Sequence, residues 1–195
     1  YQFESALPES ALHSLNSIRS KLFAMELIGE YPVEKIGYGN ISMRSNQLAS
    51  GNTQNQINQA FVITGTQTGA IKTLRPEHYT QVIHFSLDDN SVCVRGPVQA
   101  SSESLTHAAI YQANSKINSV IHIHSAGIWN GMLSDQLPST SSQVPYGTPE
   151  MAYAVMELVA LKNAGNFVMA GHQDGVVTFG RSIEEAFEIC KLLYK

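Results

Sequence analysis

The chain has 195 residues, of which 43% are hydrophobic and 14% are charged, and its net charge is −4. This length is typical of one domain, which we expect to span residues 1–195 and to fold without disulfides or a structural metal. The acidic balance excludes the basic surface that nucleic-acid binding needs, and no apolar run approaches the ~20 residues of a membrane helix.

The composition also bears on where the protein works. The sequence does not open with a basic segment followed by an apolar one, as a secretory signal does. Cys93 and Cys190 stand in apolar segments, and we expect both to be reduced core residues of a cytoplasmic protein. The low fraction of charged residues suggests a surface that is either neutral and polar or covered by another subunit.

The first half of the chain predicts one helix followed by short strands. Apolar residues recur at steps of three and four from Leu12 to Leu22, which predicts an amphipathic helix over 11–29, ended by Gly29 and Pro32. Strands are predicted at 41–44, 61–64 and 92–94, with a polar hairpin loop or meander over 45–59, a glycine- and threonine-rich turn over 65–69 and a short helix from Pro76.

Helices and strands alternate in the second half. A helix is predicted from 101–104 to about Ser115, a second begins at Pro149 with Thr148 as its N-cap, and a third follows the capping box at 182–185. Strands are predicted at 120–124, 167–170 and 176–179. This order favours an α+β fold with one central, mainly antiparallel sheet.

The pair His122-x-His124 is the sharpest chemical signal. Side chains two apart on a strand share one face, so both imidazoles can reach one metal ion, although a chance pair with one core histidine is the alternative. His172, in a Gly-His-x-Asp-Gly turn at a strand end, favours the metal reading. Three histidines without a fourth protein ligand are typical of a catalytic zinc, and other divalent metals also accept imidazole.

Carboxylates near these histidines are candidates for proton transfer. Glu103, at a predicted helix start, is a candidate acid/base beside a metal, or else only a charge that suits the helix dipole. Asp174 is equally well read as a partner that orients an imidazole or as an ordinary turn residue. His107 shares the helix face of Glu103, and a buried structural role is expected for it.

Three segments have the composition of an anion site. Gly39-Asn40, the turn from Thr64 to Gly69, and Ser101-Ser102 at a helix N-terminus offer backbone N–H groups and hydroxyls. Such groups bind phosphate without a basic side chain.

Taken in order, these segments resemble the class II aldolase/adducin family, best known for the fuculose-phosphate aldolases. The resemblance spans nearly the whole chain. It rests on Gly39-Asn40-Ile41-Ser42, Thr64–Gly69, Ser101-Ser102-Glu103, His122-Ile123-His124, Gly147-Thr148-Pro149-Glu150, Gly171-His172 and Phe179-Gly180.

The resemblance implies a three-layer α/β/α sandwich, a homotetramer with sites at subunit interfaces, and a role for each site residue. His122, His124 and His172 would bind zinc, and Glu103 would be the acid/base. Tyr146, the one tyrosine in the loop after His124 and before the next predicted helix, matches a catalytic tyrosine that this family takes from a neighbouring subunit. The phosphate pocket would be formed by Asn40, Thr64, Gly65, Thr68, Gly69, Ser101 and Ser102, with Gly65 or Gly69 facing the phosphate.

The implied reaction is retro-aldol cleavage of a small phosphorylated ketose through a zinc-stabilised enediolate. Two alternatives stay open. A sugar-phosphate epimerase or dehydratase of the same family would use the same three histidines. A non-catalytic, adducin-like interaction domain would lack the complete triad, so the presence of all three histidines argues against it.

Overall fold

The computed structural model describes residues 1–47 and 60–194, so the loop predicted at 45–59 lies mostly outside the described residues. The helices are α1 (Glu9–Ala24), α2 (Ser104–Ala113), α3 (Ala126–Ser134), α4 (Pro149–Val159) and α5 (Ile183–Leu193), with short 3-10 turns at Ser45–Gln47 and Pro76–His78. The strands are β1 (Gln2–Phe3), β2 (Gly29–Glu30), β3 (Gly37–Tyr38), β4 (Asn40–Arg44), β5 (Phe61–Thr64), β6 (Tyr79–Ser86), β7 (Ser91–Gly96), β8 (Ser119–His124), β9 (Gly165–Val168) and β10 (Gly175–Gly180).

One large sheet organises the molecule. Within the described residues, eight strands pair in the order β1-β7-β6-β5-β4-β8-β10-β9. Every neighbouring pair is antiparallel except the two-residue β1 beside β7. The strands β2 and β3 form a separate hairpin. The predicted mainly antiparallel sheet is confirmed.

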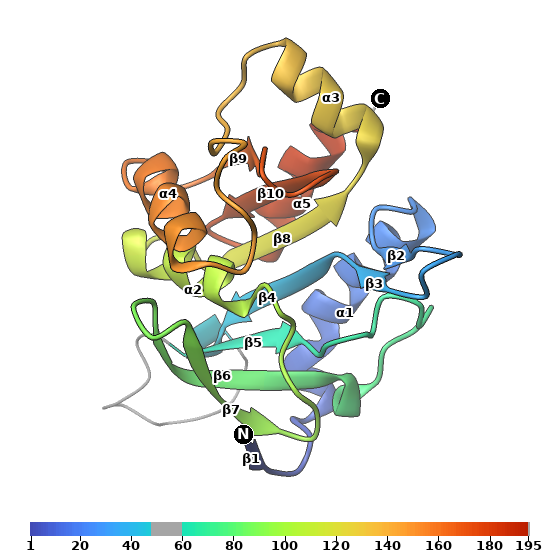
Figure 1. Cartoon of the computed structure of the whole chain (residues 1–195). Helices are drawn as coiled ribbons and strands as arrows, with labels where there is room; N and C mark the ends of the chain where they lie inside the picture. Colours follow the sequence, from blue (N-terminus) through green and yellow to red (C-terminus); the bar gives the residue numbers. More distant parts are fainter. Residues whose placement is uncertain (48–59, 195) are drawn as a thin grey trace.

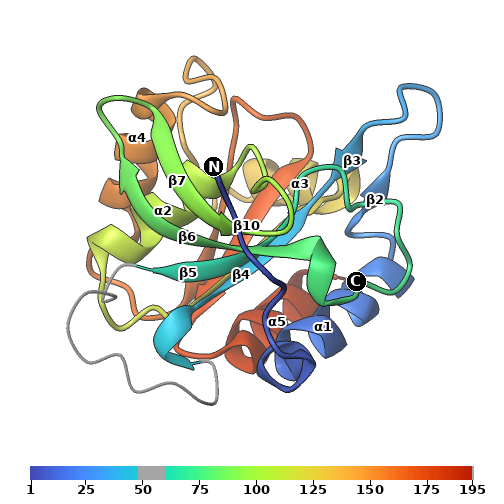
Figure 2. The same cartoon turned by 90° about the horizontal axis from the view of Figure 1, so that it is seen from below.

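Helices cover both faces of this sheet, as the views in Figures 1 and 2 show. The helices α1 and α5 pack on one face and form a core with Ile41, Ile121 and Val176. The helices α2 and α4 pack on the other face, over Ile63 and Val120. Because side chains alternate along a strand, each central strand contributes side chains to both hydrophobic cores. The result is the three-layer α/β/α sandwich that the resemblance implies.

This alternation also places the paired histidines. In β8, Ile121 and Ile123 belong to the core under α1 and α5, whereas Val120 belongs to the core under α2 and α4. His122 and His124 have the parity of Val120 and therefore lie on the α2 side of the sheet. They stand at the end of β8 nearest the N-terminus of α2.

The first helix ends earlier than its sequence pattern predicts. It stops at Ala24, where the N–H of Met25 caps the last turn, and Glu26 adopts φ 58°, which a helix cannot continue. Gly29, expected to end the helix, pairs in β2 instead, where a Cβ would collide with the Tyr38 ring. The hairpin that follows was not predicted, and it borders the site described below.

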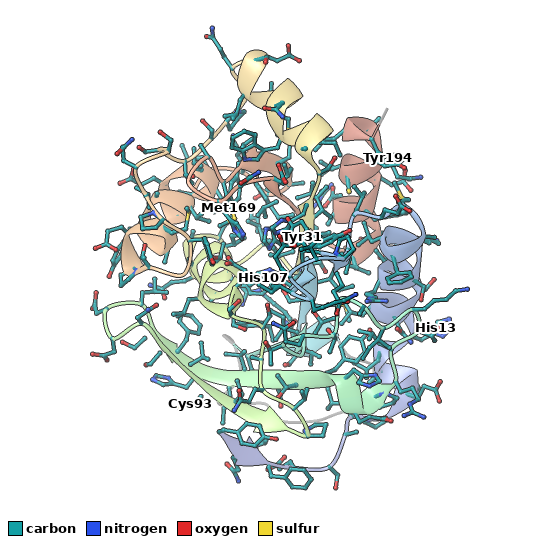
Figure 3. All side chains as sticks on the ribbon, turned by 45° about the vertical axis from the view of Figure 1, so that its right-hand side comes forward. His13, Tyr31, Cys93, His107, Met169 and Tyr194 are labelled. Carbon is teal, nitrogen blue, oxygen red and sulfur yellow. The ribbon has the colours of Figure 1, made fainter. Side chains whose placement is uncertain are left out.

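One cysteine prediction is wrong. Cys190 is buried, as expected, but Cys93 is exposed on β7 (Figure 3). The strand β7 lies near the edge of the sheet, flanked by β6 and by the two-residue β1, so the side chain of Cys93 is left uncovered. None of the helices in the described ranges is long and apolar enough to cross a membrane.

The sequence analysis also missed α3, which follows β8 directly. Two glycines and an asparagine give this segment low helix propensity. The side chain of Ser125 caps it by accepting a hydrogen bond from the N–H of Ile128. The apolar side of the helix, including Met132, packs into the core under α1 and α5. Tertiary contacts therefore override local preference here.

Candidate functional site

The three predicted histidines converge. One ligand nitrogen from each of His122, His124 and His172 lies within 4.8 Å of the others. The rings are separated by 4.8 to 5.1 Å between centroids. His172 reaches the pair from the turn between β9 and β10, because β10 is the sheet neighbour of β8 and Gly175 pairs with His124. A Cβ on Gly175 would lie 3.2 Å from Nε2 of His122, so any larger residue there would press on this ring.

The environment keeps these imidazoles neutral. Burial lowers the pKa of His122 well below its ordinary value, and the two neighbouring rings lower it further. Burial together with His172 lowers the pKa of His124 to about 3, and burial alone lowers the pKa of His172 to about 4. A neutral imidazole offers the lone pair that a metal needs. Nε2 of His122 and Nδ1 of His172 are buried without a hydrogen-bond partner, which fits a cation as their missing partner.

Two polar side chains orient the paired rings. The hydroxyl of Tyr31 lies 2.8 Å from Nδ1 of His124, which leaves Nε2 as the nitrogen free to bind a metal. The amide of Asn40 lies 3.3 Å from Nδ1 of His122, because the two residues face each other across β4 and β8. Figure 3 shows Tyr31 near the centre of the molecule, on the hairpin that the sequence did not predict. Such contacts set which nitrogen carries the proton.

Glu103 lies beside His172. It is the N-cap residue of α2, and its side chain makes no capping hydrogen bond. One carboxylate oxygen accepts a hydrogen bond from the Thr106 hydroxyl at 2.9 Å. The other lies 3.8 Å from Nδ1 of His172 and has no hydrogen-bond partner. Burial raises the pKa of Glu103 to about 6, in the range useful for exchanging a proton near neutral pH.

His107 and Asp174, the two other residues singled out from the sequence, make contacts that support the fold. His107 is fully buried, as expected, and its Nδ1 lies 2.6 Å from the hydroxyl of Ser42, which also bonds Tyr111. Asp174 takes φ 62° in the β9–β10 turn, and its backbone carbonyl accepts from Ser125. In the part of the chain that the structure describes, its carboxylate bonds no imidazole, which favours the turn interpretation.

These groups open into a cavity of about 490 Å³, a size suited to a small molecule. Its wall includes the three histidines, Glu103 and most of the predicted anion-binding residues, namely Asn40, Gly65, Thr68, Gly69, Ser101 and Ser102. Thr64 does not reach the wall. It is buried, and its hydroxyl accepts a hydrogen bond from the N–H of Ile41. Thr64 instead fastens β5 to β4 behind the pocket.

Backbone hydrogen bonds bring two of the predicted anion-binding segments together. The N–H of Ser101 donates to the carbonyl of Thr64, and the N–H of Thr66 donates to the carbonyl of Gln99. These bonds join the glycine- and threonine-rich turn to the start of α2. The N–H of Gly65 is already paired with the carbonyl of His78, so this group is not available to an anion.

Tyr146 stacks on His172, with ring centroids 4.2 Å apart and planes 20° from parallel. The tyrosine therefore borders the pocket of its own chain, whereas the resemblance implies a tyrosine from a neighbouring subunit. The loop before α4 folds back onto the β9 edge, where Ser139 bridges to Val168. The side chain of Asn90 anchors the far end of this loop through the carbonyl of Gly147.

The rim of the pocket holds residues that sequence reasoning missed. They come from the β2–β3 hairpin and from the β9–β10 turn, and include Tyr31, Glu34, Ile36, Tyr38 and Gln173. The sequence feature that could have indicated the hairpin residues is the cluster of aromatic and glycine residues just before Gly39-Asn40. Periodicity does not detect such a segment, because its two strands have only two residues each.

Comparison with known proteins gives a consistent picture. The model of the Class II Aldolase and Adducin N-terminal domain matches residues 23–195. No curated protein matches the sequence. Similar solved structures include YgbL from Escherichia coli, provisionally described as an aldolase, epimerase or decarboxylase, at 22% identity and a TM-score of 0.67 over 95% of this chain and 86% of that one.

Two further similar structures are sugar-phosphate enzymes. The L-fuculose-1-phosphate aldolase of Thermus thermophilus has 19% identity and a TM-score of 0.65, over 95% of this chain and 90% of that one. The sugar-phosphate aldolase of Thermotoga maritima has 15% identity and a TM-score of 0.63, over 94% of this chain and 90% of that one. At such identities these likenesses demonstrate a shared fold.

Proposed function

The chain belongs to the family of class II aldolases and adducin N-terminal domains, and we propose that it is a metal-dependent lyase that cleaves a small phosphorylated ketose by retro-aldol chemistry. The observation that carries this proposal is the convergence of three neutral imidazoles with Glu103 in one cavity. The sugar-phosphate aldolases that share the fold support the substrate class.

We propose zinc as the metal, held by His122, His124 and His172. A three-imidazole set without a fourth protein ligand suits a catalytic zinc, and the unpartnered ring nitrogens fit a cation. When bound, such an ion would polarise the substrate carbonyl and stabilise negative charge that develops beside it.

Two side chains of this chain would move the protons. Cleavage breaks one carbon–carbon bond, removes the proton of the hydroxyl on the carbon that becomes the aldehyde, and adds a proton to the carbon of the other fragment. Glu103, with its unpartnered oxygen and a pKa of about 6, would exchange the proton at carbon. Tyr146, stacked on His172 and half exposed, would exchange the proton of the hydroxyl.

Neutral donors would hold the phosphate. We assign this role to Asn40, Thr68, Gly69, Ser101 and Ser102, which line the cavity, with Gly65 as part of the same wall and Thr64 fixing the turn from behind. The N-terminus of α2 would add the favourable end of its dipole.

We further propose that residues 1–195 form one domain of a cytoplasmic homotetramer. The low charged fraction of 14% supports burial of surface between subunits. Light scattering should give about four times the chain mass of 21.3 kDa, and a single chain mass at micromolar protein would contradict the tetramer.

A screen of phosphorylated and free ketoses tests the reaction. Release of dihydroxyacetone phosphate and an aldehyde is expected from the purified chain, with loss of activity after chelation and in His124→Ala. Formation of an epimer or a dehydrated sugar with the same metal requirement would replace the lyase with the corresponding alternative. A protein that binds no metal and turns over no sugar would favour the non-catalytic, adducin-like alternative.

A further inference from the structure

Arg19 is a buried cation directly behind the glycine- and threonine-rich turn. Its side chain points from α1 toward the segment 68–72 and is 1% exposed. One terminal nitrogen donates to the carbonyls of Thr68 and Gly69, each at 2.9 Å, and the other donates to those of Ile71 and Lys72. Within the described ranges Arg19 pairs with no carboxylate, so its charge is balanced by peptide dipoles and by the ring of Phe23.

The same segment has N–H groups without acceptors. Among the described residues, the N–H groups of Gln67 and Gly69 donate to no carbonyl and no side chain. The carbonyl and the following N–H of a trans peptide point in opposite directions, and no peptide here is cis. Because the Thr68 carbonyl is turned toward Arg19, the N–H of Gly69 is turned away from it. Gly69 lines the cavity.

The described lining of the cavity contains no side chain that is permanently positive. Its described lining includes three carboxylates, from Glu34, Glu103 and Asp174, but neither lysine nor arginine. An anionic substrate would therefore enter a wall with an excess of acidic groups. Arg19 is the cation that bonds the lining residues directly, from the side opposite the cavity.

We propose that Arg19 is a positioning residue for anion recognition. Its guanidinium holds four carbonyls behind the turn, so that the N–H of Gly69, opposed to the Thr68 carbonyl, stays unpaired for an anion, and it places a positive charge behind that group. A planar fork with five donors can hold four carbonyl oxygens at once, which an ammonium with three donors cannot. This inference rests on the proposed phosphate-binding function and extends it to a residue outside the cavity.

Arg44 provides a matched control. It is also buried, it also donates to backbone carbonyls, those of Ile117 and Tyr111, and it also lies over an aromatic ring. Arg19 lies over Phe23 at 4.9 Å, and Arg44 lies over Tyr111 at 4.7 Å. The carbonyls that Arg44 holds belong to the C-terminal end of α2 and the residues after it, away from the cavity. Replacing either arginine therefore removes a buried guanidinium that holds backbone carbonyls, but only Arg19 holds carbonyls of residues that line the cavity.

Calorimetric titration with inorganic phosphate tests the proposal on the full chain as purified. Arg19→Lys should weaken phosphate binding about tenfold or more, while Arg44→Lys should stay within about twofold of wild type at equal metal content. Unchanged affinity in Arg19→Lys would overturn the proposal, and so would an equal loss in both variants. A wild-type protein that binds no phosphate would overturn it together with the phosphate part of the proposed function.

A second measurement needs no variant. In the wild type, phosphate should shift the amide resonance of Gly69 and leave that of Gly65, which is paired with His78, nearly unchanged. A shift of the Gly65 resonance without a shift of the Gly69 resonance would contradict the arrangement.

A third measurement is kinetic. With substrate, Arg19→Lys should raise KM for a phosphorylated ketose and leave kcat unchanged, which a general loss of stability would not do.

Discussion

Replacing Glu103 by glutamine should lower activity and raise stability together. The carboxylate is 3% exposed, and one of its oxygens has no hydrogen-bond partner. Burial raises its pKa from the ordinary 4.5 to about 6. At neutral pH the folded protein therefore carries a charge that the unfolded chain accommodates more easily in water.

The size of this effect follows from linkage. The difference between a pKa of about 6 and one of 4.5 corresponds to about 2 kcal/mol, with the protonated form favoured in the folded state. The destabilisation is complete above pH 6 and absent below pH 4.5. In metal-free protein, Glu103→Gln should thus raise the free energy of unfolding by up to about 2 kcal/mol at pH 7 and leave it unchanged near pH 4.

Catalysis should move in the opposite direction. An amide keeps the shape of the carboxylate and can still accept the Thr106 hydroxyl, but it cannot take up a proton. A general acid or base contributes about 10²–10⁴-fold in rate, so kcat should fall by that factor while bound metal is retained. The assays are kcat on an active ketose, metal content, and urea unfolding of the chelated protein.

Glu150→Gln is the control for a simple helix-dipole effect, because Glu150 is an exposed first-turn residue of α4. It should change neither turnover nor stability by more than a small amount. Turnover near wild type in Glu103→Gln would refute the acid/base role. A stability loss at pH 7 in that variant would refute the reasoning from burial.

Three further predictions follow from the same site. His172→Ala should lose bound metal and activity together, whereas the exposed His13→Ala should keep both, and retention of metal in the first variant would contradict the triad. Tyr31→Phe should weaken metal binding about tenfold by removing the hydroxyl on the second ring of the pair. Tyr38→Phe keeps its ring contact with His124 and should not weaken metal binding. An equal loss of metal affinity in both variants would rule out the hydrogen bond between Tyr31 and His124 as the cause. Metal-free protein should lose stability as pH falls below 6.5, because the histidine at position 107 is protonated in the unfolded chain but stays neutral in the folded protein, where its pKa is about 3. His107 alone should lower the free energy of unfolding by about 2 kcal/mol at pH 5. A urea midpoint that stays constant from pH 7 to pH 5 would contradict this prediction.

Much of the fold follows from local patterns. Apolar spacing located α1, because a residue that must be buried repeats with the period of its own element, while short apolar runs located the central strands and a capping box located the start of α5. The spacing of His122 and His124 placed both on one face of a strand for the same reason. The boundaries of α1 were wrong where the backbone of Glu26 leaves the helical region, which composition does not reveal.

What the tertiary structure decided concerns pairs of residues far apart in the sequence. His172 meets the other two histidines because β10 pairs with β8, and Glu103 meets His172 because α2 begins at the same end of the sheet. Thr64 does not line the cavity, because its hydroxyl is turned toward β4 and accepts a hydrogen bond from the N–H of Ile41.

Arg19 is the clearest case of this division. The sequence determined that it lies on a helix with a buried face, and a lone arginine there predicts nothing about an anion. Only the folded chain brings its guanidinium to the carbonyls of residues 68–72, about fifty positions away. Hydrogen bonds and desolvation depend on which groups meet in space, whereas periodicity reports only which residues share a face. The sequence alone therefore determined the mainly antiparallel sheet and the shared face of His122 and His124, and the tertiary structure brought His172, Glu103 and Arg19 to them.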